Sequence, residues 1–167
     1  MHRLLQLLPD IAAPDRARAA ARLLMGFTAE EQTVMLAQAE AVITSSDCAR
    51  FFGPSSRAEV PIVGRIGVRG VAGRIDRLLV EPERVTIVDF KTGRIPPGGA
   101  DKVPASYLAQ MAAYRAVLRQ IYPERAIDLV LVWTDGPEAV MLRASDLDPF
   151  EAYLTSTPVN AEASSAA

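Results

Sequence analysis

The sequence has 167 residues, of which 50% are apolar and 23% charged, and its formal net charge at neutral pH is −2. No apolar run reaches the roughly 18 residues of a membrane span, and the short apolar patch at the N-terminus does not resemble a signal peptide. The single cysteine, Cys48, excludes an internal disulfide and a cysteine-ligated zinc or iron–sulfur site. We therefore expect a cytoplasmic protein in which residues 1–154 form one domain and residues 155–167 a flexible tail.

Residues 1–53 are predicted to be mainly helical, because apolar residues at helical spacing alternate with helix start and stop signals. Thr28 and Glu31 form a capping box, which indicates a helix N-terminus at this point. The helices that follow from these signals carry no recognisable chemistry between residues 14 and 43 and are expected to serve packing. They are predicted to span residues 1–8, 14–26, 28–43 and, for a short one, 45–53.

Residues 57–154 are predicted to form a sheet core with one long helix. Runs rich in Val, Ile and Leu indicate strands, and the segment 104–122 has apolar residues at helical spacing and ends before Pro123. These elements predict an α/β fold: a mixed central sheet with an antiparallel hairpin, flanked by helices. The predicted strands are 57–68, 71–80, 85–90, 126–134 and 138–143, and a closing helix is expected at 145–154.

The hairpin formed by strands 71–80 and 85–90 brings two acidic residues together. If its turn is centred between Pro82 and Glu83, Asp76 lies directly opposite Asp89 on the neighbouring strand. Directly opposed residues share a face, with Cβ atoms about 4.5–5.5 Å apart. Because strand side chains alternate, Lys91 lies on the same face as Asp89. A register shift of one residue would place the two acids on opposite faces.

Opposed carboxylates are unfavourable for stability alone, because like charges on neighbouring strands repel. A hard divalent cation between them removes the conflict, and Mg²⁺ binds through one or two carboxylates together with substrate phosphate. Two acids that hold a metal, with an ammonium group beside them, are suited to phosphodiester cleavage. Lys91 would then position the attacking water or stabilise negative charge in the transition state. The alternative is a pair of solvated acids neutralised by Arg74, Arg77 or Lys91.

Charged residues elsewhere are unevenly distributed. Residues 49–94 carry nine basic and five acidic side chains, whereas the segments before and after them are acidic on balance. This positive excess favours contact with phosphate groups, although solvated arginines at sheet edges account for it equally well. The loop after Lys91, residues 94–99, is rich in Pro and Gly and is either a mobile contact loop or a plain surface connection.

Three motifs together resemble a known family. They are a glycine three residues before an aspartate (Gly73 and Asp76), the hexapeptide Val-Asp-Phe-Lys-Thr-Gly at 88–93, and Gln110 with Tyr114 one helical turn apart. This combination resembles the PD-(D/E)XK nucleases of the RecB type. The segments HRLLQLLP at 2–9, AEVPI at 58–62 and LVWTDG at 131–136 are similar to the C-terminal nuclease domain of AddA helicase–nuclease subunits. The likeness covers nearly the whole chain.

The resemblance implies a restriction-endonuclease-like core and assigns roles to individual residues. Asp76, Asp89 and the backbone carbonyl of Phe90 would bind the metal, and Lys91 would assist the attacking water. His2 matches a further metal ligand on the helix before the sheet, although the family has more helix before this position, so we expect His2 to fray. Supporting roles fall to Gln110, Tyr114 and Glu59, and candidate DNA contacts are Arg74, Arg77, Arg94 and Lys102.

The function implied is Mg²⁺-dependent, exonuclease-like hydrolysis of DNA, with Mn²⁺ as a substitute and no iron–sulfur cluster. The resemblance further implies a fragment of an ATP-dependent helicase–nuclease that acts in double-strand break repair and recombination. Its partners would be DNA, the helicase part of the full-length protein and an AddB-like subunit, with no membrane. Two alternatives stay open: a catalytically idle DNA-docking module, and a small-molecule phosphohydrolase that uses the same metal chemistry.

Overall fold

The structure, a computed structural model, describes residues 1–97 and 102–156. Its helices are α1 (His2–Leu7), α2 (Ala13–Leu23), α3 (Ala29–Thr44), α4 (Ala105–Ile121) and α5 (Ala144–Thr155), with short 3-10 helices η1 (Leu8–Asp10) and η2 (Ala49–Phe52). The strands are β1 (Ser56–Ile66), β2 (Arg69–Val80), β3 (Arg84–Lys91), β4 (Ala126–Trp133) and β5 (Glu138–Met141). The predicted α/β fold with a mixed central sheet flanked by helices is confirmed.

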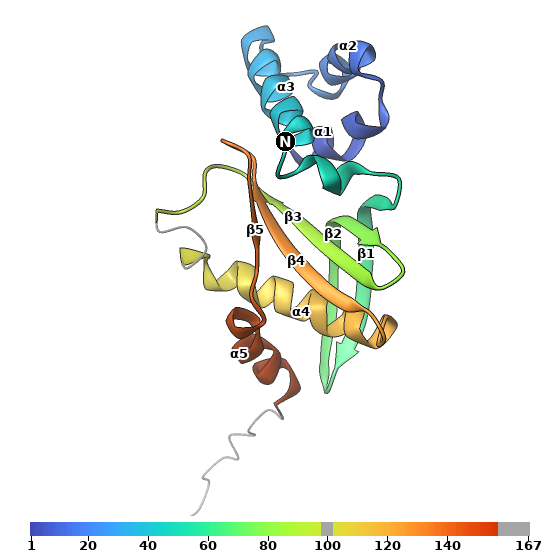
Figure 1. The fold of residues 1–167 in the computed structure, drawn as a ribbon. Coiled ribbons are helices and arrows are strands. Elements are labelled where there is room, and N and C mark those ends of the chain that lie inside the picture. Colours follow the sequence, from blue (N-terminus) through green and yellow to red (C-terminus); the bar gives the residue numbers. More distant parts are fainter. Residues whose placement is uncertain (98–101, 157–167) are drawn as a thin grey trace, which may run out of the picture.

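The described strands form one five-stranded sheet in the order β1-β2-β3-β4-β5. Neighbouring strands are antiparallel except β3 and β4, which are parallel and are connected through α4 (Figure 1). A parallel connection requires such a crossover, because the chain must return to the same end of the sheet. The sheet therefore places the C-terminal ends of β3 and β4 side by side, and Asp89 and Lys91 lie at this edge.

Each face of the sheet has its own hydrophobic cluster. Helices α4 and α5 cover one face, and α1 and α3 cover part of the other; Figure 1 shows the two groups of helices on either side of the strands. On β3 the side chains alternate between them, since Ile87 belongs to the first cluster and Val88 to the second. A strand buried on both faces reads as a continuous apolar run, which explains the composition of β3 and β4.

The ends of several elements differ from the predictions by a few residues. The capping box is present, with the Glu31 N–H donating to Thr28 Oγ1 at 3.2 Å and Thr28 N–H donating to Glu31 Oε2 at 2.7 Å. Helix α5 ends at Thr155, one residue beyond the predicted end, and residues 157–167 of the predicted tail lie outside the described residues. No helix in residues 1–97 or 102–156 is long and apolar enough to cross a membrane.

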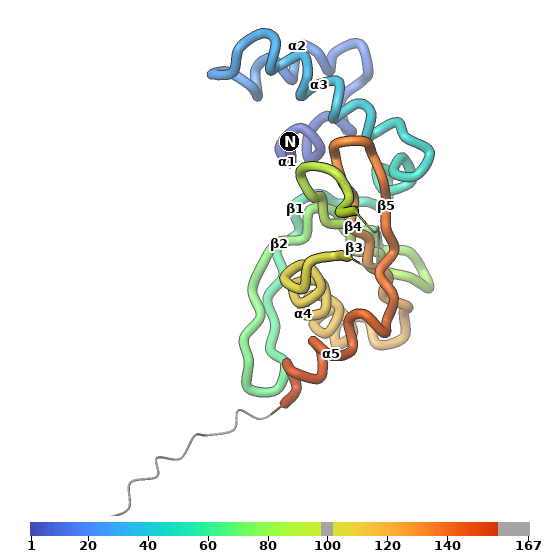
Figure 2. The backbone as a smooth tube through the Cα atoms, turned by 90° about the vertical axis from the view of Figure 1, so that its left-hand side faces the viewer, coloured from blue at the N-terminus to red at the C-terminus, as the bar shows by residue number. Residues whose placement is uncertain are grey.

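The β1–β2 hairpin is interrupted at one position. Pairing continues in a single register from Ala58–Arg77 to Val60–Ile75, but the intervening Glu59 and Asp76 are absent from the ladder. Glu59 has φ of 55°, a left-handed conformation that is uncommon outside glycine. Beyond this break the hairpin extends past α4 towards α5 (Figure 2). Asp76 therefore lies at the interruption of the β1–β2 ladder.

Tyr114 on α4 packs directly against the backbone of β2 at Gly73. A Cβ atom placed on Gly73 would lie 2.8 Å from Tyr114 Cε1 and closer still to its hydroxyl oxygen. The absence of a side chain at Gly73 thus leaves room for a tyrosine ring.

Gly73→Ala should lower the free energy of unfolding by about 1–3 kcal/mol, because the added methyl group overpacks this contact. Chemical denaturation of the two proteins measures the difference. Gly70→Ala is the matched control, since an added Cβ there meets no atom within 4 Å. An unchanged stability of Gly73→Ala would contradict the packing described here.

Candidate active site

The β2–β3 hairpin has the predicted register. Arg77 pairs with Val88 and Val80 with Val85, and the ladder ends at the Arg77–Val88 pair. The next position in this register is the one that Asp76 and Asp89 share. Because the two strands separate there, the acids lie at a fork between β2 and β3.

At the fork, the Asp76 side chain takes the place of a strand partner. Its Oδ2 accepts a hydrogen bond from the Phe90 N–H at 2.7 Å. The carbonyl of Lys91 accepts from Thr134 N–H on the β4 side, so the backbone groups of Phe90, one residue earlier, face the β2 side. The Phe90 carbonyl therefore points into the fork.

His2 reaches the same point from the first turn of α1. Its Nε2 lies 2.8 Å from the Phe90 carbonyl oxygen and 3.4 Å from Asp76 Oδ2. The hydrogen bond to Asp76 raises the pKa of His2 above its usual value, although partial burial of the ring opposes the shift. The structure thus brings the imidazole of His2, a carboxylate and a backbone carbonyl together.

Asp89 is buried, with 4% of its surface exposed. Its Oδ2 accepts a hydrogen bond from Lys91 Nζ at 2.7 Å. Burial raises the pKa of Asp89, and the charge and hydrogen bond of Lys91 oppose that shift only in part. The nearby charge of Asp76 raises it further. The site therefore holds a carboxylate whose negative charge is poorly stabilised by the protein alone.

Lys91 is held in position from α4. Its Nζ donates to Gln110 Oε1 at 3.2 Å and lies 3.9 Å from the centre of the Tyr107 ring. Gln110 Nε2 in turn donates to the Tyr114 hydroxyl at 3.3 Å. That hydroxyl is anchored to β2, because it donates to the Arg74 carbonyl and accepts from the Arg74 N–H, both at 3.3 Å. A continuous chain of contacts thus connects β2, α4 and the lysine.

One pocket contains most of the predicted site residues. It is lined by His2, Arg74, Asp76, Asp89, Phe90, Lys91, Thr92, Tyr107 and Gln110. Sequence reasoning missed Tyr107 and Thr92 as site residues. Tyr107 was detectable, because it precedes Gln110 by three residues and Tyr114 by seven, and these spacings place all three on one face of a helix.

The other predicted residues lie around this pocket or away from it. Glu59 does not line it and instead forms an ion pair with Arg74, with 3.2 Å between Oε2 and Nη1. Arg94 is exposed and lies 3.4 Å from Asp135. Lys102 is exposed. The last two residues of the predicted contact loop, 98 and 99, lie outside the described residues.

The prediction that Arg77 contacts DNA is wrong. Its side chain is 1% exposed and packs under α1, where Nη2 donates to the Leu5 carbonyl at 3.0 Å. Arg77 lies beside Leu79 on the face of β2 that the N-terminal helices cover. The sequence alone did not show that this face is covered.

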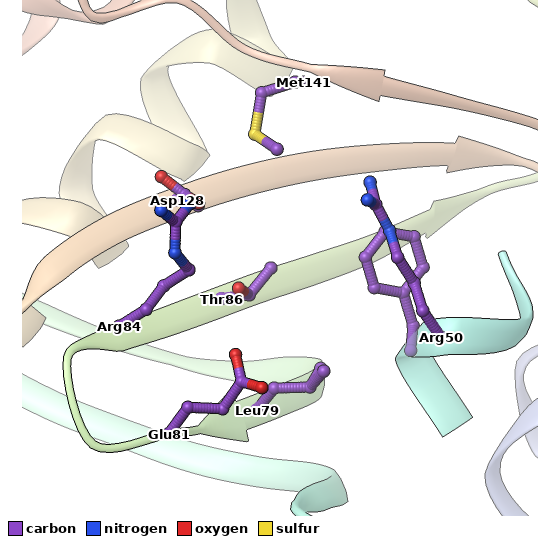
Figure 3. Close-up of a pocket in the computed structure, with 8 residues that line it drawn as sticks. Arg50, Leu79, Glu81, Arg84, Thr86, Asp128 and Met141 are labelled. Carbon is purple, nitrogen blue, oxygen red and sulfur yellow. Dashed lines mark hydrogen bonds and ion pairs between the residues drawn. The ribbon is translucent and has the colours of Figure 1, made fainter. Parts of the chain in front are cut away.

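A second pocket lies at the other end of β3 and β4 (Figure 3). Its charged groups come from η2, from the turn between β2 and β3, and from the first residues of β3 and β4; Arg84 forms an ion pair with Asp128 across β3 and β4. Thr86 lies between these groups on β3, and no predicted site residue lines the pocket. Ligands of open α/β sheets bind at the carboxyl ends of the strands, which favours the pocket at Lys91.

The donor atoms at the fork can be compared with the needs of a divalent cation. In residues 1–97 and 102–156, no three His, Cys, Asp or Glu side chains form a group that could hold a metal by themselves. Neighbouring ligands of an octahedral cation with bonds of 2.0–2.1 Å are about 2.9 Å apart. Phe90 O and His2 Nε2 are 2.8 Å apart, and His2 Nε2 and Asp76 Oδ2 are 3.4 Å apart. The residues fit a cation held by side chains and a carbonyl together.

Comparison with known proteins agrees with the fold and the motifs. The sequence model of the PD-(D/E)XK nuclease superfamily matches residues 1–162. The chain therefore belongs to the PD-(D/E)XK nuclease superfamily.

One known protein is similar to part of the sequence, and one solved structure is similar to the fold. An ATP-dependent helicase/nuclease subunit of Desulforudis audaxviator (strain MP104C) is 40% identical over 65 residues, which make up 36% of this chain and 5% of that protein. The match thus spans only a small part of that relative's length. A protein from Eubacterium rectale, described as a proposed exonuclease, has a crystal structure with a TM-score of 0.51 and 17% identity. It covers 90% of this chain and 64% of that one, and this likeness shows the fold alone.

The pKa of His2 offers a direct test of the fork geometry. His2 is the only histidine in the sequence, so the Hε1 signal of its imidazole can be followed without overlap from another histidine in an NMR titration. We expect a pKa above the usual value of about 6.5 in the metal-free protein, and Asp76→Asn should lower it. Because the pKa of His2 is higher in the folded state, the stability linked to its protonation is present below the pKa of the unfolded state. This stability is lost as the pH rises through the pKa of the folded state.

Asp128→Asn is the control for this titration, because Asp128 lies at the far end of β4 and pairs with Arg84. It should leave the His2 pKa unchanged. A His2 pKa that is at its usual value and does not change in Asp76→Asn would mean that α1 does not bring the ring to the fork.

Proposed function

We propose that this chain is a metal-dependent DNA nuclease domain that hydrolyses phosphodiester bonds at the fork between β2 and β3. The observation that carries the proposal is the convergence of Asp76, the Phe90 carbonyl and His2 beside the buried pair of Asp89 and Lys91. Membership of the nuclease superfamily supports the same reaction class. Mg²⁺ is the proposed cation, with Mn²⁺ as a substitute, because oxygen donors predominate in the site.

Asp76, Asp89, the Phe90 carbonyl and His2 would hold the cation. When bound, the cation supplies Lewis-acid polarisation of the scissile phosphate and lowers the pKa of water. The protein residues supply position and charge. Asp89 has a raised pKa because of burial, so a neighbouring positive charge stabilises its ionised form and offsets the cost of burying it.

Lys91 is proposed to act on the reacting groups directly. Its ammonium group lies in the pocket and is fixed from three sides by Asp89, Gln110 and the Tyr107 ring. A fixed cationic donor stabilises the negative charge that develops on phosphate and orients the attacking water, at little reorganisation cost. Gln110 and Tyr114 act through Lys91, because they connect it to the β2 backbone. Arg74, which lines the same pocket, is the proposed contact for the substrate phosphate.

The cellular role is part of the proposal. The partial match to a helicase/nuclease protein supports a domain that trims DNA delivered by a helicase motor, in double-strand break repair and recombination. An AddB-like subunit would be its partner. Arg94 and Lys102, both exposed, are proposed as further phosphate contacts.

Asp89→Ala should reduce the cleavage of linear single-stranded DNA by about 100-fold or more in the presence of Mg²⁺ or Mn²⁺. The reason is that the variant removes both a proposed ligand and the partner of Lys91. Asp128→Ala is the matched control, since it removes a carboxylate from the same sheet at a distance from the pocket. Gel analysis of end-labelled DNA gives the rates.

The same assay separates the alternatives. DNA binding without cleavage by the wild-type protein would indicate an idle docking module, and turnover of mononucleotides in preference to DNA would indicate a small-molecule phosphohydrolase. Equal cleavage by wild-type and Asp89→Ala protein would point to a contaminating enzyme and contradict the proposal.

A further inference from the structure

Arg77 is the largest of the almost completely buried side chains in the described part of the chain. Its Nη2 donates to the carbonyls of Leu5 and Gln6, at 3.0 and 3.3 Å, and its Nη1 donates to Ser56 Oγ at 3.3 Å. The guanidinium lies 4.8 Å from the centre of the Phe52 ring. Within residues 1–97 and 102–156, the Nε of Arg77 has no hydrogen-bond partner, and no carboxylate forms an ion pair with the Arg77 guanidinium.

This arrangement is costly for stability alone. A buried cation without a carboxylate partner incurs a desolvation penalty, and here only carbonyl dipoles, a hydroxyl and an aromatic face offset it. Burial accordingly lowers the pKa of Arg77, with Asp10 opposing the shift through its charge. An apolar residue at this position would pack against α1 at lower cost. The guanidinium therefore needs an explanation other than filling the core.

The acceptors of Arg77 point to that explanation. Leu5 and Gln6 lie in the last turn of α1, where backbone carbonyls lack partners within the helix and the helix dipole is negative. Helix α1 has only six residues, which is too short to be stable without tertiary contacts. Arg77 thus fixes the C-terminal end of a helix that depends on such contacts.

The other end of the same helix carries His2. Two consecutive residues of β2 therefore hold the two ends of α1: Arg77 holds the last turn, and Asp76 lies 3.4 Å from the imidazole in the first. Arg77 packs under α1, whereas Asp76 also lines the pocket that contains Asp89 and Lys91.

We propose that Arg77 is a positioning residue that fixes α1 on the sheet and thereby places the His2 imidazole at the metal site formed with Asp76 and the Phe90 carbonyl. This inference rests on the proposed function, since it assigns a purpose to Arg77 in binding the cation. Arg77 is adjacent in sequence to the proposed ligand Asp76, but its role involves no contact with substrate.

A double-mutant cycle on Mn²⁺ binding tests the proposal. The proteins are wild type, Arg77→Lys, His2→Leu and the double variant, and electron paramagnetic resonance of free Mn²⁺ gives the affinities. Lysine keeps the charge but cannot donate to two carbonyls and stack on Phe52 at once. Residues that orient a metal ligand typically contribute 10–100-fold in affinity, so Arg77→Lys should weaken Mn²⁺ binding by about tenfold. In the His2→Leu background it should have no further effect.

A spectroscopic readout distinguishes positioning from general stabilisation. Bound Mn²⁺ should broaden the imidazole proton signal of His2 in the wild-type protein, and this broadening should be lost in Arg77→Lys protein that keeps the near-ultraviolet circular dichroism of a folded chain. If Arg77→Lys does not fold, Ser56→Ala removes one partner of the guanidinium and should weaken the same broadening.

The outcomes separate the inference from the proposed function. Wild-type protein that binds no Mn²⁺, or binds it equally well after Asp76→Ala, would overturn both. Wild-type protein that binds Mn²⁺ at Asp76, with additive effects of Arg77→Lys and His2→Leu and unchanged broadening, would overturn the role of Arg77 alone.

Discussion

The structure of the site depends on one hydrogen bond between a side chain and the backbone at the fork between β2 and β3. Where the ladder ends, the carboxylate of Asp76 accepts the Phe90 N–H that a neighbouring strand would otherwise accept. This bond lets the two strands separate without leaving a buried donor unsatisfied. The separation exposes the Phe90 carbonyl to His2 and opens a pocket between Asp76 and Asp89. The geometry of the proposed site is therefore a consequence of where the pairing of β2 with β3 ends.

The charges at the fork are unbalanced in a way that an additional cation would relieve. Asp89 is buried with its pKa raised, and Lys91 compensates for it only in part. His2 Nε2 lies 2.8 Å from the Phe90 carbonyl oxygen and 3.4 Å from Asp76 Oδ2, and the hydrogen bond to Asp76 raises the pKa of the ring. A divalent cation bound between these groups would compensate the charges of both acids. Such unfavourable electrostatics in the resting protein are typical of functional sites.

The sequence predicted the parts of this site that depend on local pattern. The turn at Pro82 and Glu83 set the hairpin register, and that register placed Asp76 and Asp89 at the same point of the sheet. The helical spacing of Gln110 and Tyr114 placed them on one face of α4. Both inferences rely on fixed periodicities of strands and helices, which the sequence displays directly.

The features that the sequence did not predict depend on which elements cover each face of the sheet and on interruptions of its regular strands. Arg77 was assigned to the surface because alternation shows only that it faces away from Asp76, and the docking of α1 on that face involves a contact between residues 72 positions apart. The left-handed conformation of Glu59 follows no glycine or turn signal. It arises where β1 and β2 bend together, and a tertiary constraint of this kind overrides local preference.

The most direct test of the account is a crystal structure of the protein with Mn²⁺, analysed for anomalous scattering from the ion. We expect one anomalous peak in the fork, within coordination distance of Asp76, Asp89 and the Phe90 carbonyl oxygen, with His2 Nε2 turned towards it. A peak elsewhere, or carboxyl groups of Asp76 and Asp89 that point to opposite sides of the sheet, would contradict the central claim that the end of β2–β3 pairing forms the metal site.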